Sequence, residues 1–429
     1  MLRIFTKDFK QGKNILIFMF FKVLGGVFAA LLPLALAKIL APDIMGSFSL
    51  FKMIIFFVIT FFIAPLAYPF NIESNKEYAA RGKSNQTFTS FLIYIVSTVI
   101  LFFAIFVLFG KQLIGFTGLS YQEYKYIFIL AFLGLALFRI LNVFFLGQNK
   151  KTIHAIIDTV YPLTHIIYLV IIYYLNIFTL ANVLLGYFIA AVVVGLISLF
   201  FIDYSRVRPL QFSKENFKEI GRFGSWVILG TTAGYFINWG DNVVLKYFVS
   251  LSDIGVYNLA YQFFLMGLML RFFIGQYYTP FLSQKISDKE KIINYFKVKR
   301  KKILTYLLPA FLVAELVIGY VIRLLFDPSY WGAINVIRIL LVANILMIII
   351  SFHLPIFNII KKYKLANITL ILQLTLNVVL NIILVPYWGI VGAAVATTVA
   401  YLVYVIIIAI LFKNKIKPAL NDIWINNKE

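Results

Sequence analysis

The chain has 429 residues, of which 62% are hydrophobic and only 13% are charged. Soluble domains carry charges on about 25% of their residues, so this composition excludes an ordinary soluble protein and indicates a multi-pass membrane protein. The net charge of +22 does not indicate nucleic-acid binding, because Lys and Arg lie in short segments between apolar runs, and the lack of Cys excludes disulfides and thiolate chemistry.

Long apolar runs follow one another along the whole chain. A helix that crosses a bilayer needs about 20 such residues. The runs predict an all-α integral membrane protein with about twelve transmembrane helices at residues 14–40, 48–70, 88–110, 124–146, 152–175, 179–202, 222–249, 254–281, 303–326, 332–360, 365–385 and 389–412. Twelve spans place both termini on one side, and the basic residues gather in the segments on that side. The positive-inside rule therefore predicts cytoplasmic N- and C-termini.

Two longer basic segments interrupt the series of spans. Residues 203–221 lie midway and are expected to form a cytoplasmic linker between an N-terminal six-helix lobe, 1–202, and a C-terminal six-helix lobe, 222–412. Residues 413–429 are expected to form a cytoplasmic tail. The second basic segment, 282–302, spaces apolar residues among lysines. It is either a basic amphipathic helix on the inner leaflet or a solvated loop, and both interpretations stay open.

A weak internal repeat supports two related lobes. The stretch LAKILAPDIMGSFSLF, residues 36–51, shares its order of residue types with VLKYFVSLSDIGVYNLAY, residues 244–261. Both contain a Lys, a short apolar stretch, Asp-Ile, a nearby Gly and then aromatic and small polar residues. Duplicated transporter folds leave such traces, with the substrate site between the repeats. The repeat predicts two pseudo-symmetric lobes around a central cavity.

The region from 377 to 400, NVVLNIILVPYWGIVGAAVATTVA, predicts a tight hairpin of two membrane helices. Asn377 and Asn381 share one face of an apolar helix, and that polar face needs a partner other than lipid. Pro386 is expected to end the first helix. Two ridges of small residues, which allow close helix packing, follow: Gly389, Ala393 and Thr397, and Gly392, Ala396 and Ala400.

The run LNIILVPYWGIVGAAVATT also resembles the C-terminal pattern of the polysaccharide-exporter family: Asn, an apolar run, Pro, an aromatic residue and Gly-Ile-x-Gly-Ala-Ala. LAPDIMGSF, DNVVLKYFVSLSDIGVYNLAYQF and LFDPSYWGAINVIRIL resemble further segments of that family. The family includes the Wzx-type O-antigen flippases, and its superfamily also holds multidrug extruders and murein-precursor flippases.

The resemblance implies a flippase of polysaccharide and lipopolysaccharide biosynthesis. Such a protein moves undecaprenyl-diphosphate-linked oligosaccharide units, for O-antigen, capsule or a related polysaccharide, from the cytoplasmic to the outer leaflet of the bacterial inner membrane. It works by alternating access. Membrane lipids, a polysaccharide polymerase and a chain-length regulator are the other expected partners, and no cofactor is expected.

Ionisable side chains at membrane depth usually face a cavity or an opposite charge. A diphosphate is best neutralised by several cations, and Arg can bind two of its oxygens at once. The expected substrate-binding residues are Lys22, Lys52, Arg139, Arg271, Arg338, Asn238, Asn377 and Asn381. The alternative is that some of these cations form structural ion pairs, for example Arg271 with Glu315.

Three carboxylates, Asp158, Asp241 and Glu315, are the candidates for coupling transport to H⁺ or Na⁺. A role as counter-ions for nearby Lys and Arg is the alternative. His154 and Asp158 share a helix face at i, i+4, which indicates either a proton site or a hydrogen bond at a helix end. The chain contains no metal-binding or nucleophile motif, so neither a catalytic residue nor a metal site is expected.

Two other functions compete with the flippase. A multidrug or cation antiporter of the same superfamily would be expected to have an acidic chamber, whereas the intramembrane cations outnumber the carboxylates here. A membrane-embedded polysaccharide polymerase or glycosyltransferase would be expected to carry sizeable loops with catalytic groups, whereas the outer connections are short. The flippase is therefore the leading hypothesis, and the protein is not expected to be an enzyme.

Overall fold

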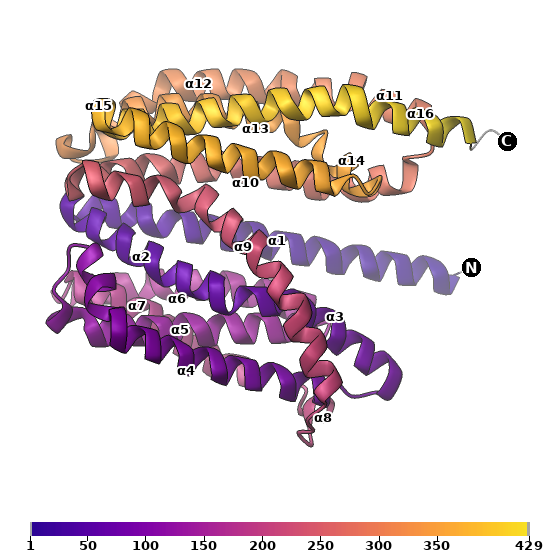
Figure 1. The fold of residues 1–429 in the computed structure, drawn as a ribbon, viewed down its shortest axis with the longest axis horizontal. Helices are drawn as coiled ribbons and strands as arrows, with labels where there is room; N and C mark the ends of the chain where they lie inside the picture. The colour runs from indigo at the N-terminus through magenta and orange to yellow at the C-terminus, as the bar shows by residue number, and fades with distance from the viewer. Residues whose placement is uncertain (1, 427–429) are drawn as a thin grey trace. The chain divides into compact units, whose positions relative to one another are not determined.

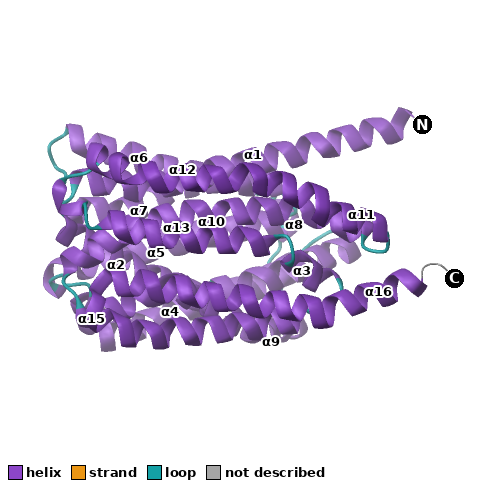
Figure 2. Cartoon of the chain, turned by 90° about the horizontal axis from the view of Figure 1, so that it is seen from above, coloured by secondary structure: helices purple, strands orange, loops and turns teal. Residues whose placement is uncertain are grey.

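The computed structural model describes the backbone of residues 2–426 and the side chains of residues 17–425, apart from those of residues 226, 229, 272, 276, 280 and 363. Helices joined by short loops make up the described part of the chain, and no strand occurs within it (Figure 2). The predicted all-α class is confirmed. In lipid, an α-helix satisfies its backbone hydrogen bonds within one segment, which explains why such an apolar chain becomes helical throughout.

The chain divides into two compact units. Unit 1 contains residues 1–35 and 47–235, and unit 2 contains residues 36–46 and 236–429. The division falls inside a helix of residues 214–248, whereas the sequence placed the linker at 203–221. The short segment 36–46, at the junction of the first two helices, belongs with the C-terminal unit.

Unit 1 is built from nine helices or parts of helices in the described chain (Figure 1). They are α1 (Leu2–Ile39), α2 (Pro42–Phe62), α3 (Ala64–Arg81), α4 (Asn85–Phe116), α5 (Tyr121–Gly147), α6 (Lys151–Tyr174), α7 (Leu180–Leu199), α8 (Tyr204–Val207) and the first part of α9 (Lys214–Phe248). Stacked aromatic rings fill the interior. The rings of Phe102 on α4 and Phe132 on α5, both almost fully buried, have centroids 3.6 Å apart.

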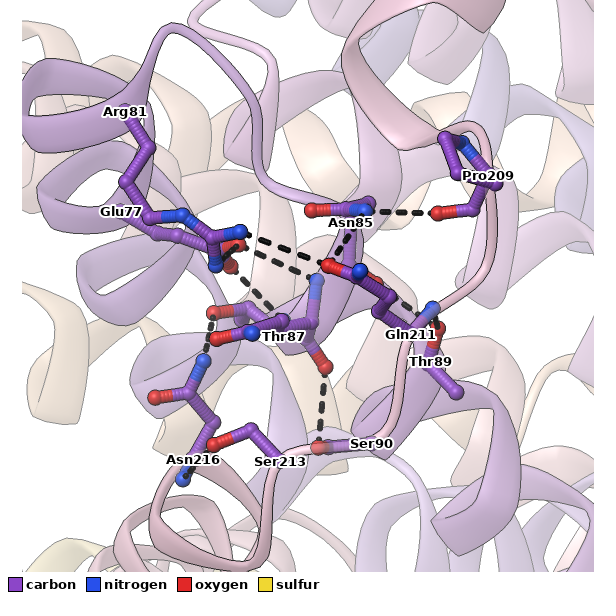
Figure 3. Close-up of polar contacts among 11 residues, drawn as sticks. Glu77, Arg81, Asn85, Thr87, Thr89, Ser90, Pro209, Gln211, Ser213 and Asn216 are labelled. Atoms are coloured by element: carbon purple, nitrogen blue, oxygen red, sulfur yellow. Dashed lines mark hydrogen bonds and ion pairs between the residues drawn. The ribbon is translucent and has the colours of Figure 1, made fainter.

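The predicted linker is tied to unit 1 by hydrogen bonds (Figure 3). Asn85 Nδ2 donates to the Pro209 carbonyl oxygen at 2.6 Å, and the Gln211 backbone N–H donates to Thr89 Oγ1 at 3.1 Å. The Arg206 guanidinium lies 3.5 Å from the Tyr78 ring centroid. The segment after α7 is therefore an ordered part of unit 1.

Glu77, the acceptor for the start of α4, lies beside this segment. Its carboxylate accepts hydrogen bonds from the backbone N–H groups of Gln86 at 3.1 Å and Thr87 at 2.8 Å (Figure 3). The first N–H groups of a helix have no partner within the helix, and their partial positive charge favours a carboxylate. Arg81 pairs with the same carboxylate at 3.3 Å. Glu77 thus joins α3 to α4 across the turn.

Unit 2 is also helical (Figure 1). Besides the end of α1, the start of α2 and the end of α9, its elements are α10 (Leu251–Lys285), α11 (Lys289–Asn294), a π-helical turn η1 (Tyr295–Arg300), α12 (Lys301–Leu325), a 3₁₀ turn η2 (Pro328–Tyr330), α13 (Ala333–Ser351), α14 (Leu354–Ile359), α15 (Tyr363–Leu411), a second π-helical turn η3 (Phe412–Ile416) and α16 (Lys417–Asn426). The predicted basic segment 282–302 is mostly helical, and residues 289–325 form one helix without a loop.

The predicted hairpin lies within α15, which contains one non-helical residue, Gly389 (φ 54°, ψ −134°). The helix runs through Pro386, contrary to the prediction, and breaks at Gly389, because a positive φ is open to glycine at little cost. Tyr387 and Trp388, at this turn, are exposed. The small-residue ridges allow close packing: a Cβ on Gly392 would lie 2.5 Å from the Leu384 carbonyl oxygen.

The two copies of the internal repeat contact each other within unit 2. A Cβ on Gly46 would lie 2.0 Å from the Leu251 carbonyl oxygen, and a Cβ on Gly255 would lie 1.9 Å from the Pro42 carbonyl oxygen. The backbone of each copy therefore packs directly against the glycine of the other copy. The shared Asp-Ile…Gly pattern marks a backbone-to-backbone contact between the starts of α2 and α10.

Ten stretches in the described chain are long and apolar enough to cross a membrane. One of them, residues 42–81, includes α2 and α3, and another, residues 364–425, includes both arms of the α15 hairpin. The expected span at 222–249 coincides with the α9 helix, which is not among the ten. The multi-pass architecture is confirmed, and the count of twelve and the cytoplasmic termini remain predictions.

Candidate functional site

Unit 1 contains an open cavity of about 330 Å³ lined by its transmembrane helices. Three of the predicted substrate-binding cations line it: Lys22 from α1, Lys52 from α2 and Arg139 from α5. Asp158 from α6, a predicted coupling residue, lies in the same wall. Tyr161, His165, Tyr187, Phe56 and Phe138 are among the other lining residues. The cavity therefore brings together residues far apart in sequence, such as Lys22 and Asp158, which are 136 positions apart.

Close packing of α1 against α6 sets the position of Lys22. A Cβ on Gly25 would lie 2.8 Å from the Asp158 carbonyl oxygen, so only glycine allows the two backbones to come this close. One turn away, Thr159 Oγ1 donates to the Phe21 carbonyl oxygen at 2.5 Å. Since Lys22 lies between these two contacts on α1, its side chain reaches the polar face of α6.

Lys22 and Asp158 form an ion pair at the cavity wall. Lys22 Nζ is also 2.8 Å from His154 Nε2, and His154 Nδ1 is 3.1 Å from the Asn142 carbonyl oxygen. An ammonium group only donates, so His154 Nε2 accepts while Nδ1–H donates to the carbonyl, as in a neutral imidazole. Asn142 Nδ2 donates to the other carboxylate oxygen of Asp158. Four residues from three helices thus pair their charged and hydrogen-bonding groups with one another.

The other two cations that line the cavity are Lys52 and Arg139. Among the described side chains, no carboxylate lies within 4.0 Å of Arg139, whose guanidinium is 5.8 Å from the Phe138 ring centroid. Lys52 Nζ lies 5.7 Å from the Phe56 ring centroid. Three cations against one carboxylate leave the lining positively charged. In a site with little water, such charges act on an anion more strongly than they would in bulk solvent.

Unit 2 contains a separate buried polar cluster around Asp241 of α9, which is 4% exposed. Asn381 Nδ2 and Thr397 Oγ1, from the two arms of α15, each donate to its carboxylate at 2.8 Å. The Tyr257 hydroxyl of α10 donates to it as well. Asn377 Nδ2 donates to Thr397 Oγ1 at 3.0 Å. The Asn377–Asn381 face predicted to need a polar partner therefore finds it in Asp241.

The other predicted residues lie elsewhere in unit 2. Arg338 of α13 pairs with Glu315 of α12 at 3.8 Å, so two residues assigned to different roles form one ion pair. Arg271 of α10 has no carboxylate within 4.0 Å among the described side chains, which differs from the alternative pairing with Glu315. Asn238 lies on α9, three residues before Asp241. Their roles in transport remain predictions.

Sequence reasoning missed several partners in both clusters. Asn142 was not selected, although it lies three residues after Arg139 on the same helix face. Tyr257 and Asn258, whose amide donates to Asn242 Oδ1 at 2.6 Å, were also not selected. The signal that could have identified these partners is a polar residue one helical turn from an intramembrane charge. Tyr257 and Asn258 lie within the internal repeat, where the pattern drew attention to Asp253 and Gly255 instead.

Comparison with known proteins agrees with this architecture. The chain is similar to a probable flippase, AglR, of Haloferax volcanii, with 23% identity over 216 residues, which cover 49% of this chain and 45% of the relative. The matched part is thus less than half the length of that relative. The chain also shares its fold with the lipid II flippase MurJ (TM-score 0.74, 16% identity, covering 96% of this chain and 90% of MurJ).

A multidrug resistance transporter of the MATE family, in the MOP superfamily, has a similar fold (TM-score 0.75, 17% identity, covering 93% of this chain and 94% of the transporter). A family model described as polysaccharide biosynthesis protein matches residues 11–285 of the chain. This match contains all of the described cavity lining in unit 1, and it also reaches Asp241 in unit 2. The chain belongs to the polysaccharide biosynthesis protein family.

Proposed function

We propose that the protein is a flippase that moves a glycan linked to a polyprenyl diphosphate lipid across a membrane. The observation that carries the proposal is the cavity of unit 1, where Lys22, Lys52 and Arg139 face one carboxylate inside a bundle of apolar helices. A diphosphate crossing the bilayer needs such groups, because an unneutralised anion in hydrocarbon is very costly. The similarity to the flippase AglR supports the same function.

The finer assignment is also part of the proposal. We propose that the lipid carrier is undecaprenyl diphosphate, that the glycan is an O-antigen, capsule or related repeat unit, and that the membrane is the bacterial inner membrane. Transport by alternating access, and partnership with a polymerase and a chain-length regulator, are expected on the same grounds. These points derive from the resemblance of the sequence to the Wzx-type flippases.

Two alternatives make different predictions. A cation antiporter is favoured by the similarity in fold to the MATE transporter, but the excess of cations in the cavity would repel a cationic drug. A polymerase or glycosyltransferase would form glycosidic bonds in purified protein. Export of a cationic dye by the wild-type protein would favour the first alternative, and sugar transfer would favour the second.

Deletion of the gene in its native host tests the proposal. Lipid-linked repeat units are expected to accumulate on the cytoplasmic leaflet and surface polysaccharide is expected to disappear. Plasmid-borne wild-type protein and a Lys111→Gln control, which removes an exposed charge at the end of α4, are expected to restore export. Lys22→Gln and Arg139→Gln are expected to restore much less. Normal polysaccharide in the deletion strain would overturn the proposal.

We also propose that Asp241 couples transport to a monovalent cation, H⁺ or Na⁺. Asp158 and Glu315 contact cationic side chains, whereas no Lys or Arg in the described part of the chain lies within 4.0 Å of Asp241. A buried, ionised carboxylate without a cation is costly. The amide oxygens of Asn377 and Asn381 are buried without a donor, and such oxygens suit a hard cation.

The coupling proposal is tested with purified protein. If Na⁺ binds at Asp241, NaCl is expected to raise the melting temperature more than KCl at the same ionic strength, and Asp241→Asn is expected to abolish the difference. If H⁺ is the coupling ion, a pH gradient drives transport by the wild-type protein and not by Asp241→Asn. Full response of Asp241→Asn to both ions would contradict the proposal.

A further inference from the structure

A second cavity, of about 570 Å³, lies on the surface of unit 2 where η1 continues into α12. Three cations, Lys297, Arg300 and Lys301, line one part of it, and Phe296, Leu304 and Leu308 line the rest. No carboxylate among the described side chains lies within 4.0 Å of the three cations. The lining therefore carries three positive charges beside an apolar wall.

Helical spacing places these residues in one stripe. Residues 297, 300, 301, 304 and 308 recur at intervals of three or four, so they lie on one face of the helix that runs from 289 to 325. The π-helical turn Tyr295–Arg300 contains the first two of these cations, and single π turns are frequent at functional sites. The cations occupy the start of a candidate membrane span, and the leucines lie further along it.

Neighbouring side chains hold Arg300 in place. Arg300 Nη1 is 3.4 Å from His353 Nε2, and its guanidinium lies 5.3 Å from the Phe296 ring centroid. The His353 ring packs against Phe296 and Phe412, with centroid distances of 5.1 and 4.7 Å. A guanidinium only donates hydrogen bonds, so His353 Nε2 is the acceptor for Arg300. Arg300 is thus oriented before any ligand arrives.

We propose that this groove, lined by Phe296, Lys297, Arg300, Lys301, Leu304 and Leu308, binds one anionic phospholipid. Its phosphate contacts the three cations, and one of its hydrocarbon chains lies along Leu304 and Leu308. The helix rises about 1.5 Å per residue, so residues 297 to 308 span roughly 16 Å, enough to hold a headgroup and the first part of a chain. On the predicted orientation, this lipid belongs to the cytoplasmic leaflet.

Charge and position together favour a membrane lipid over a soluble anion. Guanidinium and ammonium groups bind phosphate oxygens through charge-assisted hydrogen bonds. The apolar wall would gain nothing from a soluble phosphate, whereas each buried CH₂ of a lipid chain contributes about 0.8 kcal/mol. The site lies in a different unit from the cavity with Lys22, so the inference is independent of the proposed flippase activity.

The inference is tested by native mass spectrometry of the full-length protein in detergent micelles titrated with phosphatidylglycerol. Phosphatidylcholine serves as the lipid without net charge. The wild-type protein is expected to retain one phosphatidylglycerol at least tenfold more tightly than phosphatidylcholine. Combined replacement of Lys297, Arg300 and Lys301 by Gln is expected to remove this preference.

A matched control separates this site from general attraction to the membrane. Combined replacement of Lys413, Lys415 and Lys417 by Gln removes the same charge from exposed positions of η3 and α16 and is expected to change affinity less than twofold. Thr305→Trp fills the groove without changing any charge and is expected to weaken retention at least fivefold. Equal losses in the two triple variants, or full retention in Thr305→Trp, would overturn the inference.

Discussion

The ability of the unit 1 cavity to bind an anion depends on which of its cations Asp158 contacts. Its carboxylate contacts Lys22 and accepts a hydrogen bond from Asn142, while Arg139 has no carboxylate neighbour within 4.0 Å in the described part of the chain. In the absence of cargo, Asp158 therefore compensates the positive charge of Lys22, whereas the guanidinium of Arg139 is available to bind an anion. On the proposed function, a phosphate that enters the cavity competes with Asp158 for Lys22. Asp158 is thus expected to oppose binding and to assist release.

This competition predicts opposite effects from two neighbouring substitutions. Lys22→Gln is expected to weaken binding of a polyprenyl diphosphate about tenfold or more, since a hydrogen bond to a charged group contributes roughly 1.5–3 kcal/mol. Asp158→Asn frees the ammonium group and is expected to bind the same lipid more tightly while transporting it more slowly. Calorimetry with purified protein measures both affinities, and Lys111→Gln is the control. Weaker binding by Asp158→Asn would contradict this account.

At the scale of single elements, the capping of α4 by Glu77 is a specific contribution to stability. Glu77→Ala removes two hydrogen bonds to backbone N–H groups and leaves the start of α4 without an acceptor. The loss is expected to be about 1–3 kcal/mol and to lower the melting temperature. Glu73→Ala removes only a pair with the exposed Lys76, which contributes at most about 1 kcal/mol. Thermal unfolding in detergent distinguishes the Glu77→Ala and Glu73→Ala variants. Equal melting temperatures of the two variants would show that Glu77 is not a cap.

The break in α15 leads to a second prediction about an element. Gly389 has φ 54° and ψ −134°, a region that residues with a Cβ rarely adopt. Gly389→Ala is expected to destabilise the hairpin by about 1–3 kcal/mol. Gly275→Ala, within α10 and with open space where a Cβ would lie, is expected to be neutral or slightly stabilising. A melting temperature for Gly389→Ala at or above that of Gly275→Ala would contradict the assigned strain.

At the scale of the whole molecule, the sequence predicted best those features that depend on a single helix. Apolar runs of about 20 residues predicted the helices, and the i, i+4 spacing placed Asn377 and Asn381 on one buried face. Partners on other helices were not predictable, because their approach depends on packing. Asn142 beside Asp158, and Tyr257 and Thr397 beside Asp241, are of this kind.

Errors at helix ends have a related cause. A proline removes one hydrogen bond but does not have to stop a membrane helix, so α15 continues through Pro386 to the glycine that permits the reversal. The polar composition of residues 203–221 suggested a cytoplasmic linker between the two lobes. Its hydrogen bonds to α4, through Asn85 and Thr89, depend on a fold that no local pattern encodes.

The central claim is that the protein moves a diphosphate-linked glycan lipid by means of the cations in its unit 1 cavity. The most direct measurement uses proteoliposomes with a fluorescent oligosaccharide on a polyprenyl diphosphate and a membrane-impermeant quencher that reports the leaflet of the label. The account predicts rapid exchange between leaflets with wild-type protein and with Lys111→Gln, and at least tenfold slower exchange with the Lys22→Gln, Arg139→Gln double variant. Exchange no faster with wild-type protein than in empty liposomes, or equally fast with the double variant, would contradict it.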